Sequence, residues 1–204
     1  MRSGCGSGWT GATDNAMQGH WCERAIDYDG SQLRAHWLLD RFALAGDAIV
    51  GFRGACDVTP DEVADLADLD GPGIRGAQMV HFVWEAFAAT DLLLAVHRQR
   101  LLSAQAVEVL GELAPTAAIR RDGDDLYVGD AKLSISIATV SPVSALIHFA
   151  VNESPDGAPV AIACLRELGV DGRAFGERLL ARVVAEQASI DTARAKVRAK
   201  GEWR

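Results

Sequence analysis

The chain has 204 residues, of which 49% are hydrophobic, and a formal net charge of −8, which is enough for one domain with a full core. The acidic balance excludes the basic surface that nucleic-acid binding requires, and the longest apolar run falls short of the roughly 20 residues of a membrane-spanning helix. We therefore expect a soluble, cytoplasmic protein whose partners include neither nucleic acid nor a membrane.

The first residues predict an extension and not a folded element. Residues 1–22 are rich in glycine and serine, and Trp9 and Trp21 are their only large aromatic side chains. They contain no apolar core of the kind that a secretory signal needs. We expect a flexible N-terminal extension over 1–22 and a single domain over 23–204.

Strand-like and helix-like segments alternate in the first third of the domain. Residues 24–29 (RAIDYD) predict a first strand, and Ser31 is a suitable N-cap for a helix that runs through Leu44. Residues 48–53 (AIVGFR) predict a buried strand. Residues 60–69 predict an acidic surface helix whose carboxylates form a solvated face.

The segment 71–76, GPGIRG, has the glycine spacing of a dinucleotide-binding loop but not its context. That loop lies between a strand and a helix, whereas here a strand-like run, 78–87, follows. The segment favours a glycine-rich loop that lets the backbone approach a ligand. Alternation along 78–87 predicts two faces, with Val80, Phe82 and Trp84 on one and His81, Val83 and Glu85 on the other.

The longest helical pattern covers 91–113 and precedes a strand-rich region. Its apolar stripe consists of Leu94, Leu101, Ala104, Val107 and Leu110. Strand-like segments then cover 116–121, 125–128, 132–140 and 145–152. A glycine and an aspartate at 129–130 predict a short hairpin turn between two of them.

The last pattern is an amphipathic helix with Asp171 as its N-cap. Its apolar stripe, at steps of three and four residues, consists of Phe175, Leu179, Val183, Ile190, Ala193 and Val197. Together the elements predict an α+β fold, a mixed and mainly antiparallel sheet covered by two or three long helices.

Lys132 is unusual because this chain otherwise places its positive charge on arginine. The sequence has seventeen arginines and three lysines, and the other two lysines, Lys196 and Lys200, are close to the C-terminus. The ammonium of lysine is compact and its pKa shifts readily on desolvation, which suits it to chemistry. Lys132 is therefore the first candidate for a functional residue.

Strand alternation predicts a polar face around Lys132. Ser134 and Ser136 are expected to share its face, and His148 and Asn152 to lie on the same face of the next strand. The intervening residues are expected to face the core: Leu133, Ile135 and Ile137. Polar groups that converge on rigid strands are typical of a ligand site; an ordinary solvent-exposed face is the alternative.

Several segments, in order, resemble known families. The runs SQLRAHWLLDRFALAGDAIVGFRG, GPGIRGAQMVHF and GDDLYVGDAKLSISIATVSPVSALIHFAVNES are similar to the first helix and strand, the glycine-rich loop and the central strands of the biotin and lipoate protein ligases. Over about 24–197 the chain most resembles the domain-of-unknown-function family 366. The resemblance implies the biotin/lipoate ligase catalytic fold.

The resemblance also implies roles for individual residues. Lys132 would contact a substrate carboxylate and an adenylate phosphate, and Asp125 would be the aspartate of the preceding hairpin. The remaining substrate-binding candidates are Arg53, Arg75, Gly76, His81, Ser134, Ser136, His148 and Asn152. ATP or acyl-CoA would be the cofactor, and the partner would be a small carboxylate or an acyl donor. The basic loops of the biotin and lipoate ligases are absent from this sequence.

A second branch of the same fold transfers octanoyl groups with a cysteine nucleophile and a lysine. Cys164 lies close to the position of that cysteine, and Cys56, just after a predicted strand, is the competing candidate. A thiolate beside Lys132 would have a lowered pKa and be nucleophilic. The alternative for each cysteine is a small buried side chain.

Three functions remain open from the sequence. The leading one is an acyl-adenylate ligase or acyltransferase, and the first rival is a non-catalytic small-molecule-binding or regulatory module with the same pocket. A metal-assisted hydrolase that uses His81, Glu85 and His148 is the weaker alternative. The open edges of the predicted sheet favour a homo-oligomer.

Overall fold

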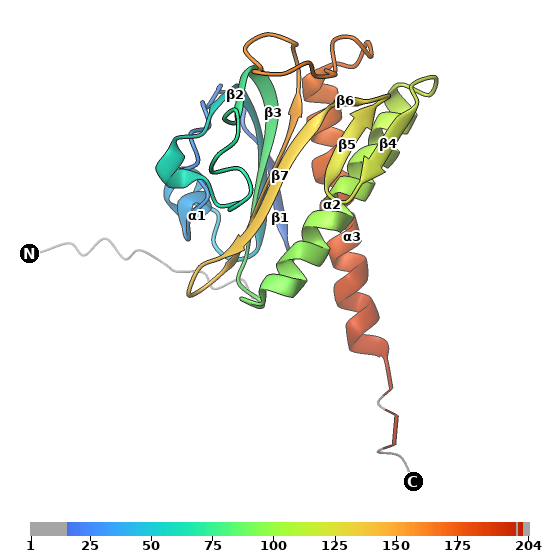
Figure 1. Cartoon of the computed structure of the whole chain (residues 1–204). Helices are drawn as coiled ribbons and strands as arrows, with labels where there is room; N and C mark the ends of the chain where they lie inside the picture. Colours follow the sequence, from blue (N-terminus) through green and yellow to red (C-terminus); the bar gives the residue numbers. More distant parts are fainter. Residues whose placement is uncertain (1–15, 199, 202–204) are drawn as a thin grey trace, which may run out of the picture.

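A computed structural model describes residues 16–198 and 200–201 and shows an α+β fold (Figure 1). Its large sheet has five strands in the order β1-β2-β3-β8-β7. Their bounds are Gln18–Trp21 for β1, Ala48–Asp57 for β2, Arg75–Ala86 for β3, Ser134–Val140 for β7 and Ala145–Asn152 for β8. Only the β1–β2 pair of this sheet is parallel, so the predicted mixed, mainly antiparallel sheet is confirmed.

A small sheet and three helices complete the domain. The small sheet has the order β4-β5-β6, with bounds Ile119–Asp122, Asp125–Val128 and Ala131–Lys132. The helices are α1 (Trp37–Phe42), α2 (Leu92–Leu113) and α3 (Gly172–Lys196). The predicted N-cap of α3 is confirmed, because the Asp171 carboxylate accepts from the Ala174 amide; the Asp91 carboxylate caps α2 in the same way by accepting from the Leu94 amide. No helix in the described part of the chain is long and apolar enough to cross a bilayer.

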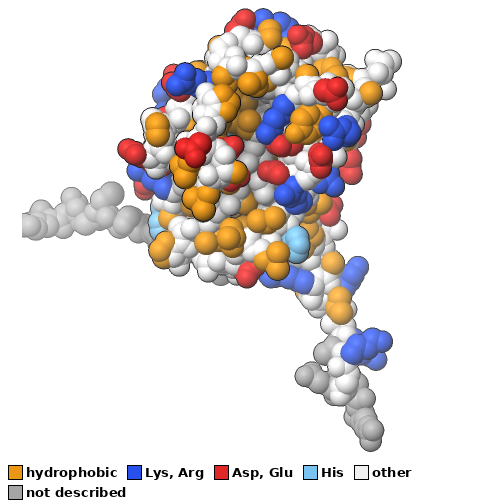
Figure 2. Space-filling view, viewed as in Figure 1, with side chains coloured by type: hydrophobic (Ala, Val, Ile, Leu, Met, Phe, Trp, Pro, Cys, Tyr) orange, Lys and Arg blue, Asp and Glu red, His pale blue; other side chains and the backbone are white. Residues whose placement is uncertain are grey.

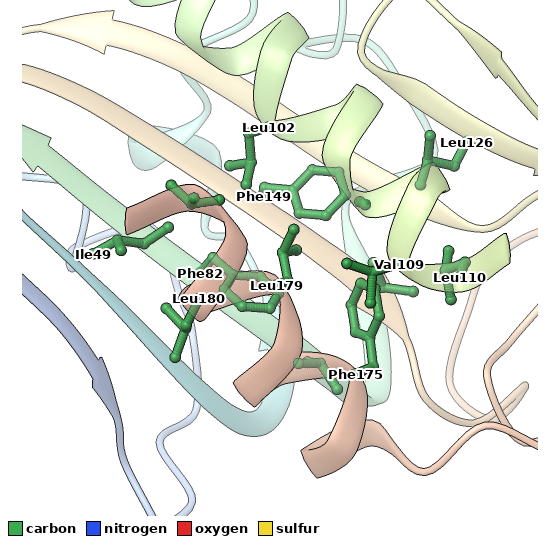
Figure 3. Close-up of a cluster of buried hydrophobic side chains, with 14 of the residues drawn as sticks. Ile49, Phe82, Leu102, Val109, Leu110, Leu126, Phe149, Phe175, Leu179 and Leu180 are labelled. Carbon is green, nitrogen blue, oxygen red and sulfur yellow. The ribbon is translucent and has the colours of Figure 1, made fainter. Parts of the chain in front are cut away.

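The main core lies between one face of the large sheet and helices α2 and α3 (Figure 3). Phe82 and Phe149, from β3 and β8, meet Leu102 of α2 and Phe175 and Leu179 of α3. The predicted alternation of β3 is confirmed, since its even-numbered residues from 80 to 84 lie in this core and the odd-numbered ones face away. The opposite face of the sheet carries a smaller cluster that includes Trp37, Phe52 and Met79.

The predicted stripe of α2 is confirmed at its end, where Leu110 is buried in the core and Val107 packs against it, but it is wrong at its start. Leu94 is 37% exposed, whereas the buried positions begin at Ala95 and continue through Leu102, Ala106 and Val109. The buried face is therefore rotated by about one residue from the predicted one. Its leucine-rich start, LLLAV, offers several apolar stripes, and packing on the sheet and on α3 selects one of them.

The predicted elements before β2 are also corrected. Residues 24–29 are extended along β2 but form only a single bridge, between Tyr28 and Cys56. The helix predicted from Ser31 begins only at Trp37, because His36 has a left-handed φ of 66°. In place of the acidic helix over 60–69, a single 3-10 turn covers Pro60–Glu62.

The expected extension over 1–22 is wrong for its last residues. Met17 is buried in the core, and β1 pairs with β2 along its whole length. The ring of Trp21 fits between Gly51 of β2 and Gly176 of α3, where an added Cβ would come within 2.8 Å and 2.1 Å of it. The domain thus includes β1, while residues 1–15 lie outside the described part of the chain.

Candidate ligand-binding site

A cavity of about 210 Å³ opens on the face of the sheet that α2 and α3 do not cover. Strands β7 and β8 form its floor, and the segments 58–75 and 158–162 enclose it. Its walls are mostly apolar: Val58, Val63, Ile74, Ile135, Ile137 and Ile162. Over segment 58–75 the space-filling view shows hydrophobic side chains interspersed with acidic ones (Figure 2). Such a cavity is suited to the apolar body of a small molecule.

Lys132 borders this cavity at the end of β6. Its Nζ lies 2.9 Å from Oδ2 of Asp125, and its side chain is 40% exposed. The Asn152 side chain fixes the backbone here, since its Nδ2 donates to the carbonyl oxygens of Lys132 (3.3 Å) and Ala163 (3.1 Å). The lysine is thus oriented by a carboxylate on a well-anchored strand end, and one side of it stays open to a ligand.

The two serines do not share the face of the cavity, so that prediction is wrong. The Ser134 hydroxyl accepts from the Leu126 amide at 2.9 Å. The Ser136 hydroxyl accepts from Nε2 of Gln99 on α2 and donates to the carbonyl of His148. Both hydroxyls therefore point to the core side, although the two residues border the cavity.

An irregularity at Leu133 explains the reversal. Leu133 belongs to neither β6 nor β7, its amide donates to the Leu126 carbonyl and its side chain is fully buried. The alternation expected from Lys132 onward is broken there, and a slip of one residue moves each following side chain to the other face. Ile135 and Ile137, predicted to face the core, line the cavity instead.

His81 and His148 form a buried pair beside the cavity. Nδ1 of His81 lies 3.1 Å from Nε2 of His148, and Nε2 of His81 lies 3.3 Å from the Gly54 carbonyl oxygen. The ring of Tyr28 stacks on His148 with centroids 3.7 Å apart. Burial lowers the pKa of His81 to about 4 and, with the neighbouring His81, holds that of His148 well below its ordinary value.

The set His81, Glu85 and His148 does not assemble as a metal site. Oε1 of Glu85 accepts from the His36 amide and from the Ser144 hydroxyl, both at 2.8 Å. Among residues 16–198 and 200–201, no group of three or more His, Cys, Asp or Glu side chains is placed to hold a metal ion. Glu85 instead anchors the start of α1 and the turn between β7 and β8.

Neither candidate cysteine has the properties expected of a nucleophile. Cys56 and Cys164 are both buried, and neither borders the cavity. Burial raises the pKa of the Cys56 thiol to about 12 and also raises that of Cys164. The predicted lowering of a thiol pKa beside Lys132 is therefore wrong, and both residues fit the alternative of small buried side chains.

The predicted arginines have separate positions. Arg53 lies away from the cavity, where its Nη2 pairs with Glu153 at 2.8 Å and Asp171 at 3.3 Å. Arg75 does border the cavity, but its Nε pairs with Asp57 at 3.1 Å. Gly76 follows Arg75 in β3 and is paired with Cys56 of β2.

Sequence reasoning missed Tyr28 and the acidic residues that line the cavity: Glu62, Asp65 and Asp68. The acidic residues were predicted to form the solvated side of a helix, and only their three-residue spacing marks a shared side. Tyr28 lies in the segment predicted as the first strand, whose alternation gave no sign that its ring would reach β8. These contacts depend on how the chain before β2 and the segment after it fold over the sheet.

Solved structures share this fold. A protein of unknown function from Pyrococcus horikoshi superposes with a TM-score of 0.86 at 43% sequence identity, covering 90% of this chain and 99% of that one. The Aquifex aeolicus biotin protein ligase in complex with biotin and ATP gives a TM-score of 0.55 at 13% identity, covering 84% and 70%. A T. acidophilum protein with bound lipoic acid, a candidate lipoate protein ligase, gives 0.51 at 14%, covering 85% and 87%.

Sequence comparisons identify the family. An uncharacterized protein from Methanocaldococcus jannaschii is 38% identical over 151 residues, which are 71% of this chain and 67% of that protein. The model of the family described as domain of unknown function (DUF366) matches residues 17–198. The chain therefore belongs to the DUF366 family, and its fold is similar to the catalytic fold of the biotin and lipoate protein ligases.

Proposed function

We propose that the cavity binds a small acyl acid with its carboxylate against Lys132, and that the protein acts on this group as a ligase or acyltransferase. The observation that carries the proposal is a strand lysine at the border of a mostly apolar cavity. An ammonium held by one carboxylate keeps further N–H donors for a second anion. It would also stabilise negative charge that develops on acyl oxygens during transfer.

Apolar walls support an acyl group as the body of the ligand. Ile135 and Ile137 from the floor, with Ile162 from the enclosing segment, present hydrocarbon surface beside the lysine. The similar structures of the ligase fold hold biotin or lipoic acid, each of which is a carboxylic acid on a hydrocarbon chain. A medium-chain acid is therefore a suitable first probe.

One observation favours a non-catalytic binding module as the second candidate. Glu62, Asp65 and Asp68 line the cavity, and their negative charge opposes the phosphates of ATP. The guanidinium of Arg75 already pairs with Asp57. Binding of an acid and activation of that acid are therefore tested separately.

Calorimetric titration with octanoic acid and octanamide tests the binding. The wild-type protein is expected to bind the acid and to discriminate against the neutral amide, because only the carboxylate pairs with the ammonium. Lys132→Met is expected to weaken acid binding roughly 10- to 100-fold, as for loss of a charge-assisted hydrogen bond. Arg166→Met is the matched control, because it removes the same charge from an exposed side chain away from the cavity.

The proposal fails if the protein binds none of octanoic acid, biotin and lipoic acid. It also fails if the Lys132→Met variant binds the acid as tightly as the wild type. Catalysis is read from pyrophosphate release with ATP and acid, and from free CoA released from octanoyl-CoA. We expect one of these products, with the rate reduced by Lys132→Met. An acid that binds without either product would identify the binding module instead.

A further inference from the structure

The buried histidine pair has one consistent arrangement of protons. The Gly54 carbonyl can only accept a hydrogen bond, so Nε2 of His81 carries the proton that reaches it. A neutral His81 then has a bare Nδ1, which accepts from Nε2 of His148. A neutral His148 with its proton on Nε2 has a bare Nδ1.

The surroundings keep both rings neutral and fixed. His81 has no exposed surface and His148 is only 3% exposed, and this burial disfavours the charged form of each ring. Phe52 stacks on His81, and Tyr28 stacks on His148 with an angle of 6° between the rings. The two aromatic contacts hold the ring planes, so His148 keeps its orientation toward the cavity that it borders.

The remaining nitrogen of His148 has no protein partner. Within the described part of the chain, Nδ1 of His148 makes no hydrogen bond, and it is not among the side-chain atoms that are buried without a partner. Because His148 borders the cavity, this acceptor is accessible from there. Its immediate surroundings on the floor include Ile137, which is directly paired with His148 and offers no donor.

We propose that Nδ1 of His148 selects ligands with an O–H or N–H donor at the end remote from their carboxylate. The inference rests on the proposed function, which places the carboxylate at Lys132. Lys132 lies beside Asn152, whose amide reaches its carbonyl, and His148 precedes Asn152 by four residues of one strand, about 13 Å at 3.3 Å per residue. That separation matches a medium-chain acid with a polar group at its far end.

The physical basis of the selection is an unpaired acceptor in an apolar cavity. A terminal hydroxyl that enters the cavity loses its hydrogen bonds to water and recovers one from Nδ1 of His148. Without that acceptor the hydroxyl beside Ile137 loses this hydrogen bond, and the hydroxy acid binds more weakly relative to the plain acid. His81 acts here as a positioning residue, because it holds the tautomer of His148.

The test compares octanoic acid with ω-hydroxyoctanoic acid by calorimetric titration. The wild type is expected to bind the hydroxy acid at least as tightly as the plain acid. His148→Phe keeps a stacked ring without nitrogen, and it is expected to lower the ratio of the two affinities roughly tenfold or more. His148→Asn places an amide oxygen about where Nδ1 lies, and it is expected to restore part of the ratio.

A second measurement does not depend on a ligand or a variant. In ¹⁵N spectra of histidine-labelled protein at neutral pH, both buried rings are expected to show the Nε2–H tautomer. A proton on Nδ1 of His148, or an unchanged affinity ratio in His148→Phe, would overturn the inference while both acids still bind through Lys132. If neither acid binds the wild type, the carboxylate proposal fails and this inference fails with it.

Discussion

Two buried rings, His81 and His148, link the stability of the protein to pH. The pKa of His81 is lowered to about 4 and that of His148 falls well below its ordinary value, whereas an unfolded histidine titrates near 6.5. Between these values the unfolded state binds more protons. The contribution of the two rings to the free energy of unfolding is therefore fully present above pH about 6.5. As the pH is lowered from there, it decreases by up to about 1.4 kcal/mol per pH unit for each ring.

Urea unfolding at several pH values from about 5 to 7 measures this slope in a range where most carboxylates stay ionised. His148→Phe is expected to remove about half of it, because one of the two titrating rings is lost. His20→Gln is the matched control, since it replaces a histidine that is exposed on β1. A wild-type stability that is flat over this range would contradict the buried neutral pair.

Single residues were predictable where their type alone carried the signal. Lys132 was found from composition, and it borders the cavity with His148 and Asn152 as alternation predicted. Ser134 and Ser136 were misplaced because one irregular residue, Leu133, resets the alternation, and nothing in the residue types marks it. Side-chain direction within a strand therefore follows from sequence only as far as the strand stays regular.

At the scale of elements, two glycines in helices give opposite expectations for the same substitution. A Cβ at Gly176 of α3 would lie 2.1 Å from the Trp21 ring, which Gly51 confines on its other side. Gly176→Ala is expected to destabilise the protein by about 1–3 kcal/mol through overpacking. Gly111 of α2 has no atom within 4 Å of its added Cβ, so Gly111→Ala is expected to stabilise it by about 0.5–1 kcal/mol.

Calorimetric melting of both variants checks this pair of expectations. Because the same methyl group is added to a helix interior in each case, helix propensity cancels and the difference reports contact with Trp21. Equal shifts in melting temperature would contradict the wedged position of this ring.

Elements were predictable where a pattern had one solution. Strands β5 and β8 have the predicted bounds, α2 covers all but the first residue of the predicted helix, and α3 begins after its predicted cap. The acidic helix over 60–69 does not form; in place of its apolar face, Val63 of that segment lines the cavity. Local pattern cannot distinguish an apolar face that packs on the core from apolar side chains that enclose a cavity.

The whole molecule was predictable as a fold because the order of strands and helices, and the motifs along them, agree across most of the chain. The enclosing segments 58–75 and 158–162 were not, since they form little regular structure and their positions depend on long-range contacts with the sheet. Those segments line the cavity together with Tyr28 and Lys132. The loop segments that enclose the cavity, and so shape the space for a ligand, are thus the part of the site with the weakest sequence signal.

Helix α3 buries only the first part of the apolar stripe that the sequence predicts from Phe175 to Val197. Leu179 is fully buried, whereas Ile190 is 38% exposed, and Figure 1 shows α3 continuing beyond the sheet. Leu179→Ala is expected to cost about 2–5 kcal/mol, and Ile190→Ala to stay within about 0.5 kcal/mol. Urea unfolding at two protein concentrations measures both. A large loss at Ile190 that shrinks as the protein is diluted would mean that a second copy covers this end of α3, and the predicted homo-oligomer would then form there and not at a sheet edge.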